Sequence, residues 1–172
     1  MTKDLAGNED RLLADLAART IPFEHYEHPA VFTVEESRPI KQDIPGEHTK
    51  NLFLKDADGK FWLLTVPAEA RVDLKSLPHA IGCKRVSFGK PDDMFDLIGV
   101  EPGSVTPLAA INAAPGRITV VLDAKLATAS RVNVHPLRNT ATIGLSGADL
   151  LDLLHHWGHE PLVSAIPTQD AQ

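Results

Sequence analysis

The residues best suited to chemistry stand late in the chain. His135 follows the alternating pair Val132 and Val134, as expected at the end of a half-buried strand, and Asn139 stands four residues further on. Pro136 lacks a backbone donor and should end that strand. An imidazole can act as a general base or hold a substrate, and a carboxamide can orient either one. The same pair could equally serve a turn, with His135 bonded to the backbone and Asn139 as its cap.

Two further segments carry residues that suit ligand binding. Lys50 and Asn51 open a strand-like segment, and Gly103-Ser104-Val105-Thr106-Pro107 forms a loop. A lysine ammonium is a compact charge that suits a phosphate, and a glycine lets a ligand approach the backbone closely. A solvated charge and a plain turn would also explain these segments. Arg38 and Lys41 form a small basic group, which a solvated helix face would explain as well.

These segments occur together in an order and at spacings that chance rarely produces. The matching pieces are, in chain order, His28-Pro29, Val31 to Glu36, Thr49 to Leu54, Gly103 to Pro107, and Val134 to Leu137 with Asn139. As a set they resemble the YbaK/ProX family of aminoacyl-tRNA deacylases, which is related to the editing insertion of bacterial prolyl-tRNA synthetases. The resemblance runs from about residue 28 to 157. The free-standing ProXp-ala branch, which clears alanine from proline tRNA, is the most similar.

The resemblance implies roles for the matching residues. Lys50 would hold the 3′-terminal region of the tRNA, and the loop at Gly103 would line the aminoacyl pocket, where backbone N–H groups can bind a developing oxyanion. His135 would shape the pocket and fix the substrate, or act as general base. We therefore expect catalytic roles for Lys50, Gly103 and His135, substrate contacts from Asn51, Ser104, Val105, Thr106, Pro107 and Asn139, and tRNA contacts from Arg38, Lys41 and Lys50.

The implied activity is hydrolysis of mischarged Ala-tRNA(Pro) by water, with no metal and no cofactor. An aminoacyl ester is already reactive, so a site that positions one water and stabilises the oxyanion suffices. A tight pocket should accept alanine and reject proline by clash. Serine or cysteine as the cleaved residue, and a module that binds tRNA or a synthetase without hydrolysis, are the alternatives. The expected partners are the acceptor end of tRNA(Pro) and an aminoacyl-tRNA synthetase.

Three other groups suggest chemistry that we do not expect. His155 and His159 have the i, i+4 spacing of helical metal ligands, but Gly158 should end the helix between them. Cys83 is a lone thiol, which is more often structural than nucleophilic. Ser104 lacks the Gly-x-Ser-x-Gly elbow of a serine nucleophile.

Composition indicates one soluble domain. The 172 residues are 43% hydrophobic, which is enough for a full core, and the single cysteine excludes an internal disulfide. A net charge of −6 argues against a general polyanion binder but allows a local grip on a few phosphates. The polar N-terminus is not a secretory signal, and no apolar run suits a membrane, so the cytoplasm is expected. We expect a domain over residues 1–166 and a disordered tail over 167–172.

Periodicity and turn residues predict the elements that must position these groups. Helices are expected at about 9–19, 33–38, 73–77, 90–98 and 146–157. Strands are expected at about 22–28, 48–55, 60–66, 84–88, 118–123, 132–134, 140–145 and 161–166. Strands in a hairpin-rich order with irregularly placed helices favour an α/β domain of the α+β kind, with a central mixed, largely antiparallel sheet flanked by helices.

Overall fold

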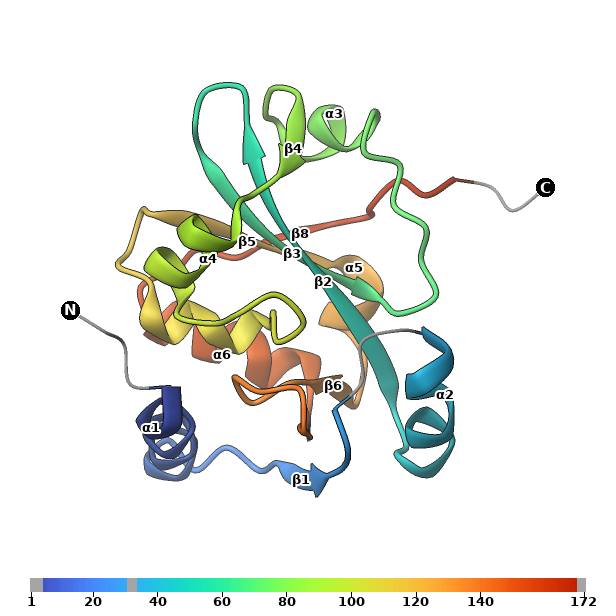
Figure 1. Cartoon of the computed structure of the whole chain (residues 1–172), viewed down its shortest axis with the longest axis vertical. Coiled ribbons are helices and arrows are strands. Elements are labelled where there is room, and N and C mark those ends of the chain that lie inside the picture. Colours follow the sequence, from blue (N-terminus) through green and yellow to red (C-terminus); the bar gives the residue numbers. More distant parts are fainter. Residues whose placement is uncertain (1–4, 31–33, 170–172) are drawn as a thin grey trace.

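A mixed sheet organises the protein (Figure 1). The structure is a computed structural model that describes residues 5–30 and 34–169. The described residues form eight strands: β1 (Glu24–Glu27), β2 (Glu47–Asp56), β3 (Phe61–Pro67), β4 (Val86–Phe88), β5 (Ile118–Asp123), β6 (Val132–Val134), β7 (Ala141–Leu145) and β8 (Leu162–Ser164). Their spatial order is β1-β7-β6-β2-β3-β5-β8, and β4 pairs with β2 outside this path.

The strand pairings confirm the predicted fold class. Within the described ranges, β1–β7, β2–β3, β2–β4 and β6–β7 are antiparallel. The pairings β2–β6, β3–β5 and β5–β8 are parallel. The helices are α1 (Leu5–Ala18), α2 (Val34–Asp43), α3 (Leu77–Ile81), α4 (Pro91–Ile98), α5 (Ala124–Ala127) and α6 (Gly147–His156), with the 3₁₀ helix η1 (Pro107–Asn112). The result is a mixed sheet flanked by helices.

Two apolar clusters lie on the two faces of the sheet because successive strand residues point in opposite directions. In β3, Leu63 belongs to the larger cluster, which also holds side chains of α1, α4 and α6, whereas Leu64 belongs to the smaller one. The smaller cluster includes Leu77 of α3 and Val86 of β4. In Figure 1, α4 and α6 accordingly lie apart from α3 and β4. Both faces of β3 are buried, which explains its continuous apolar run.

Two helices differ from the sequence prediction, and proline is the reason in both cases. Pro39 was expected to stop α2, but α2 continues through it to Asp43, and Ile44, bonded to Ile40 O at 3.1 Å, is buried. Pro78 was expected to end a helix at residues 73–77, but it stands in the first turn of α3, where no N–H is needed.

The first two helices and the C-terminal segment can also be compared with their predicted bounds. α1 already includes Leu5, so this helix begins earlier than the expected residue 9. Residue 33, where the second helix was expected to begin, lies outside the described residues. Thr168 bridges to Val72, and the N–H of Gln169 donates to Arg71 O at 2.7 Å. The disordered tail over residues 167–172 stays a prediction, and residues 170–172 lie outside the described part of the chain. In the described ranges no helix is long and apolar enough to cross a membrane.

Candidate functional site

The β6–β7 hairpin fixes the orientation and charge of His135. The residue directly follows β6, and its Nδ1 lies 3.0 Å from the carbonyl oxygen of Ala141 at the start of β7. A carbonyl only accepts, so Nδ1 carries the proton and the neutral ring presents a lone pair at Nε2. Burial lowers the pKa of His135, the Ala141 bond opposes this shift, and His28 lowers the pKa further. His135 is therefore held as a neutral imidazole with a basic Nε2.

A second histidine lies beside the first. The ring centroids of His28 and His135 are 6.5 Å apart. Nδ1 of His28 lies 2.9 Å from the Pro29 carbonyl oxygen, and its Nε2 lies 2.8 Å from Oγ1 of Thr142 in β7. By the same reasoning Nδ1 donates, so in the neutral ring Nε2 accepts from the Thr142 hydroxyl. His28 belongs to the family pattern in the sequence but was not among the predicted site residues, because no local motif marks its approach to His135.

The pairing of β2 with β6 brings Lys50 and His135 to the same end of two neighbouring strands. Strands β2 and β6 run parallel, with His48 opposite Asn133. Lys50 stands two residues beyond this pair within β2, and His135, also two residues beyond it, directly follows the end of β6. The Thr49 hydroxyl donates to Asn133 O at 2.7 Å, which ties the strands together at this point. A shared sheet face for Lys50 and His135 is an expectation from the two-residue repeat of strand side chains.

Asn51 points to the other face. Its Oδ1 accepts from the hydroxyl of Thr65 at 2.6 Å, and Thr65 is buried in β3. Because neighbours in a strand alternate, Asn51 and Lys50 project from opposite sides of β2. A substrate contact by Asn51 stays a prediction, and the geometry requires that it come from the face opposite Lys50.

The glycine loop connects α4 to η1 and is anchored at one end. Gly103 is exposed with φ of +96°, a conformation that favours glycine, and Ser104 N donates to Glu101 O at 3.0 Å. Thr106 is buried and its hydroxyl caps η1 by accepting from Leu108 N at 3.3 Å. Pro107, also buried, is the first residue of η1. These two residues hold the loop in place.

The loop and the histidine turn share one apolar support. Val105 packs against the larger core cluster, and Leu137, two residues after His135, is a member of that cluster. Leu137 has φ of +74°, so the turn holds a non-glycine residue in the left-handed region. The role of Gly103, Ser104 and Val105 in an aminoacyl pocket stays a prediction.

The expected tRNA contacts lie on α2. Arg38 is exposed on this helix, and Lys41 belongs to the same helix with a side chain outside the described part. The loop after α2 leads directly into β2, and His48 Nε2 donates to Ile44 O at 2.9 Å. Asn139 is half-buried in the turn before β7. The expected contacts of Arg38 and Lys41 with tRNA, and of Asn139 with the substrate, stay predictions.

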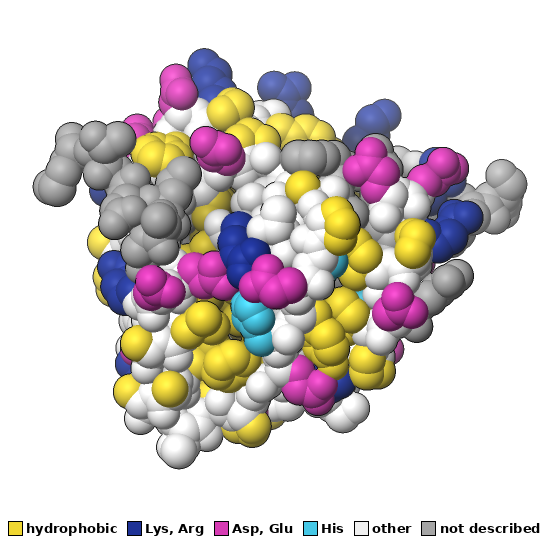
Figure 2. All heavy atoms as spheres, turned by 60° about the horizontal axis from the view of Figure 1, so that its bottom comes forward, with side chains coloured by type: hydrophobic (Ala, Val, Ile, Leu, Met, Phe, Trp, Pro, Cys, Tyr) yellow, Lys and Arg dark blue, Asp and Glu magenta, His cyan; other side chains and the backbone are white. Residues whose placement is uncertain are grey.

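An ion-pair network outside the expected residues braces the histidine turn. Arg138 Nε donates to Glu9 of α1 at 2.5 Å, and its terminal nitrogen donates to Glu27 of β1 at 2.6 Å. Arg138 also donates to the Thr140 hydroxyl at 2.7 Å. The hydrogen bond from Arg138 lowers the pKa of Glu27. Figure 2, in which the bottom of Figure 1 comes forward, shows acidic and basic side chains beside a histidine on this face.

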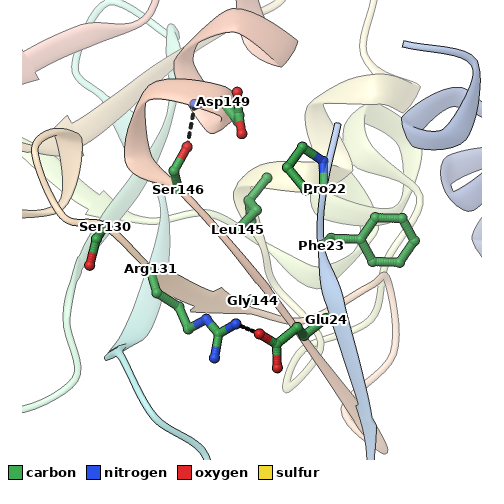
Figure 3. A pocket seen from close by; sticks show the side chains of 9 residues that line it. All are labelled: Pro22, Phe23, Glu24, Ser130, Arg131, Gly144, Leu145, Ser146 and Asp149. Carbon is green, nitrogen blue, oxygen red and sulfur yellow. Dashed lines mark hydrogen bonds and ion pairs between the residues drawn. The ribbon is translucent and has the colours of Figure 1, made fainter. Parts of the chain in front are cut away.

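A hollow of about 240 Å³ lies between β1, β7 and the start of α6 (Figure 3). Arg131, which precedes β6, forms an ion pair with Glu24 of β1 across Gly144. The Ser146 hydroxyl accepts from Asp149 N at 3.0 Å as the cap of α6. These polar groups therefore bond to one another, and we assign the hollow a structural role in joining β1, β7 and α6.

His159 and Cys83 each form a hydrogen bond to a backbone carbonyl that suits a structural role. Within the described residues, no group of three His, Cys, Asp or Glu side chains could hold a metal ion. His159 is buried, and its Nε2 donates to Ala110 O at 2.8 Å. Burial raises the pKa of Cys83, whose thiol donates to Lys84 O at 3.2 Å. A raised pKa disfavours the thiolate that a nucleophile would need.

Comparison with known proteins identifies the family. Residues 28–153 match the model of the aminoacyl-tRNA editing domain, and the chain belongs to this family. The Prolyl-tRNA synthetase associated domain-containing protein 1 of Bos taurus is 38% identical over 166 residues, which cover 92% of this chain and 96% of the relative. The Prolyl-tRNA editing protein ProX of Acetoanaerobium sticklandii is 34% identical, with 81% and 85% covered. The predicted resemblance is confirmed.

A solved structure shows the same fold. It is described as a "putative trans-editing enzyme for prolyl tRNA synthetase", and it superposes with a TM-score of 0.68 at 21% sequence identity. The superposition covers 93% of this chain and 98% of the other. Its sheet and helices therefore correspond to those described above over nearly the whole length of both chains.

Proposed function

We propose that this protein hydrolyses the aminoacyl ester of mischarged tRNA, and that Ala-tRNA(Pro) is its preferred substrate. The observation that supports the proposal is the parallel pairing of β2 with β6, because Lys50 in β2 and a neutral His135 directly after β6 each stand two residues beyond its last pair. Membership of the editing-domain family supports it, as does the relative that is named a prolyl-tRNA editing protein. The expected compartment is the cytoplasm, and a synthetase is an expected partner.

The reaction needs one water molecule and one stabilised charge. The oxygen of water attacks the ester carbonyl carbon, the carbonyl oxygen becomes an oxyanion, and the bond to the ribose oxygen then breaks. The ribose hydroxyl regains a proton, and free amino acid and tRNA are released. Lys50 holds a phosphate next to the ester, and backbone N–H groups of the Gly103 loop face the oxyanion. Nε2 of His135 binds the substrate in the pocket or accepts the proton of water.

Selection must rest on the exclusion of larger residues. An apolar pocket distinguishes one methylene by only about 1–3 kcal/mol, whereas a clash with a ring is stronger. The rings of His28 and His135, with centroids 6.5 Å apart, would form one wall of the pocket at the end of β6. We infer a pocket that takes alanine, with serine and cysteine as the nearest competitors and proline excluded.

One assay tests the activity and its preference together. Ala-, Ser-, Cys- and Pro-charged tRNA are deacylated side by side by the wild type, Lys50→Ala, His135→Ala and the control His155→Ala, an exposed histidine on α6. Ala-tRNA(Pro) should be cleaved fastest, and Lys50→Ala should lower kcat/KM by about 100-fold or more. His135→Ala should abolish the reaction or admit Pro-tRNA. A wild-type protein that cleaves none of the four would refute the hydrolase and favour the binding module.

A separate variant tests whether Arg38 and Lys41 of α2 bind tRNA. Replacing Arg38 and Lys41 with glutamate should raise KM for tRNA because each lost cation weakens attraction to phosphates. An unchanged KM would remove both residues from the interface.

A further inference from the structure

A second hollow lies at the end of β2 and β3 that is remote from Lys50. It measures about 440 Å³, and its lining comes from the β2–β3 turn and the segment that enters β5: Gly59, Lys60, Phe61, Gly116, Arg117, Ile118 and Thr119. No residue of the proposed ester site lines it. The hollow is therefore separate from the chemistry described above, although β2 leads from one site to the other.

Strand register gathers cations at this hollow. β3 and β5 are parallel, with Phe61 opposite Ile118, so the preceding residues Lys60 and Arg117 stand side by side. Both are exposed. Lys55 of β2 adds a third cation, with its ammonium 5.4 Å from the centre of the Phe61 ring. Lys60 directly precedes β3, Arg117 directly precedes β5 and Lys55 lies near the end of β2, so three basic residues stand at one end of the sheet.

Nearby acids offset part of this charge, because the Asp56 carboxylate attracts the Lys60 ammonium. Asp56 is buried, and its carboxylate accepts N–H groups from Asp58, Lys60 and Trp62 at 2.9 to 3.0 Å. Asp58 lies 3.4 Å from Lys84. Among the residues that the structure describes, neither Lys60 nor Arg117 forms an ion pair within 4.0 Å. In a chain of net charge −6, such a group favours an anionic ligand.

The backbone around the hollow is open to a large ligand. Gly59 and Gly116 have φ of +83° and +85°, and no atom lies within 4 Å of the position that a Cβ would take at either residue. Glycine therefore serves the two turns and leaves the rim without side chains. A ligand phosphate can approach both turns without displacing anything.

We propose that this hollow binds backbone phosphates in the acceptor arm of the tRNA, as a second point of attachment. The proposal rests on the proposed function. Lys50 stands opposite Val66 of β3, and Lys60 lies six residues before Val66 on the same side of the sheet, about 20 Å away along the strand. A stacked nucleic-acid strand advances about 3.4 Å per phosphate, so this span corresponds to about six nucleotides. A strand whose last nucleotide lies at Lys50 therefore reaches the hollow with phosphates close to its double-helical part.

The test removes both lining cations. The double variant Lys60→Ala/Arg117→Ala should raise KM for Ala-tRNA(Pro) about 10-fold, with the loss confined to substrates long enough to reach the hollow. The alanyl ester of adenosine is the short substrate for comparison. The slope of log affinity for tRNA against log salt should fall by about 1.4–1.8, because two phosphate contacts are lost. The charge-matched control is Arg71→Ala/Lys75→Ala, whose two exposed cations lie in the segment before α3.

Each outcome decides the proposal. An unchanged KM and salt slope, or an equal change in the control, would overturn it. Binding of uncharged tRNA, measured by fluorescence anisotropy, separates this proposal from the hydrolase. If the wild type cleaves no ester but the double variant binds tRNA more weakly than the control, the proposed ester hydrolysis is refuted and the phosphate site in the hollow is supported. Weakened binding of inorganic phosphate with unchanged tRNA binding would assign the hollow to a small anion and refute the tRNA site.

Discussion

His28 and His135 lie 107 positions apart in the sequence, yet their ring centroids are 6.5 Å apart and their planes tilted by 55°. The pairing of β1 with β7 brings them together, and His28 N donates to Thr140 O at 3.0 Å directly beyond that pairing. Each ring has its Nδ1 bonded to a backbone carbonyl, so the orientation of both is set by the backbone. The face that we assign to the ester therefore has two imidazoles of fixed tautomer.

Thr142→Val tests whether this arrangement matters for catalysis. The valine removes the hydroxyl that donates to His28 Nε2 and keeps the shape of the side chain, at a site where Thr142 is buried. We expect kcat/KM for Ala-tRNA to fall about 10-fold and the free energy of unfolding to fall by about 1 kcal/mol. Thr142→Ser keeps the hydroxyl and should restore most of the activity. Equal activity of the valine and serine variants would contradict a positioning role for His28.

The pH dependence follows from the direction of the His135 shift. Burial lowers the pKa of His135 below its ordinary 6.5, so between the two values the unfolded chain binds more protons than the folded one. Stability from this residue is therefore complete above about pH 6.5 and is lost as the pH falls toward the lowered value. Deacylation should likewise be constant from pH 7 to 8 and decline below about 6.5.

NMR titration of His135 and unfolding curves at pH 5.5 and 7.5 measure these effects. His135→Asn places an amide donor near Ala141 O and cannot titrate, so its stability should lose this part of the pH dependence. A measured pKa of His135 at or above 6.5 would contradict the neutral ring.

Much of the fold could be predicted because local patterns set it. The alternation of Val132 and Val134 gave β6 at its observed bounds, and the run Ile118–Asp123 gave β5. The strand that carries Lys50 was also placed to within one residue at each end. Periodicity fixes these elements, whereas the parallel pairings β2–β6 and β3–β5 depend on contacts between segments far apart in the chain. Sequence patterns do not show which residues stand opposite each other in such pairings.

The same limit explains which site residues were missed. The partner of His28 is Thr142, and the partner of Arg138 is Glu9, at sequence separations of 114 and 129. No local motif joins such residues, so composition and spacing could point to Lys50 and His135 but not to the groups that hold them. The placement of Lys50 and Asn51 on opposite faces follows from strand alternation and was available from the sequence.

Glu9→Gln tests the brace between α1 and the histidine turn. The Glu9 side chain is 17% exposed and accepts two bonds from Arg138, at 2.5 and 3.1 Å. Loss of its charge should lower the free energy of unfolding by about 1 kcal/mol, discounted for the partial exposure of Arg138. Glu160→Gln is the control, because Glu160 is exposed and only contacts His155 at 3.5 Å. Urea unfolding at low salt measures both, and equal midpoints would show that the brace adds nothing.

Asp56→Ala tests the turn that presents Lys60 to the second hollow. The buried Asp56 carboxylate accepts from Trp62 Nε1 at 3.0 Å and from two N–H groups of the turn, so an alanine leaves a buried indole N–H unpaired. We expect a loss of about 2–3 kcal/mol in the free energy of unfolding. Asp58→Ala, at the exposed end of the same turn, should change it by no more than about 0.5 kcal/mol.

Acid should reduce the difference between the Asp56 variant and the wild type. Burial raises the pKa of Asp56, but the bonds from Trp62 and the turn outweigh it and hold the pKa below 3.8. The contribution of Asp56 is therefore present above about pH 3.8 and is lost as the pH falls through the lowered value. Urea unfolding at pH 7 and pH 3 measures this. Equal losses for Asp56→Ala and Asp58→Ala at pH 7 would show that the turn holds Lys60 in place without the buried carboxylate.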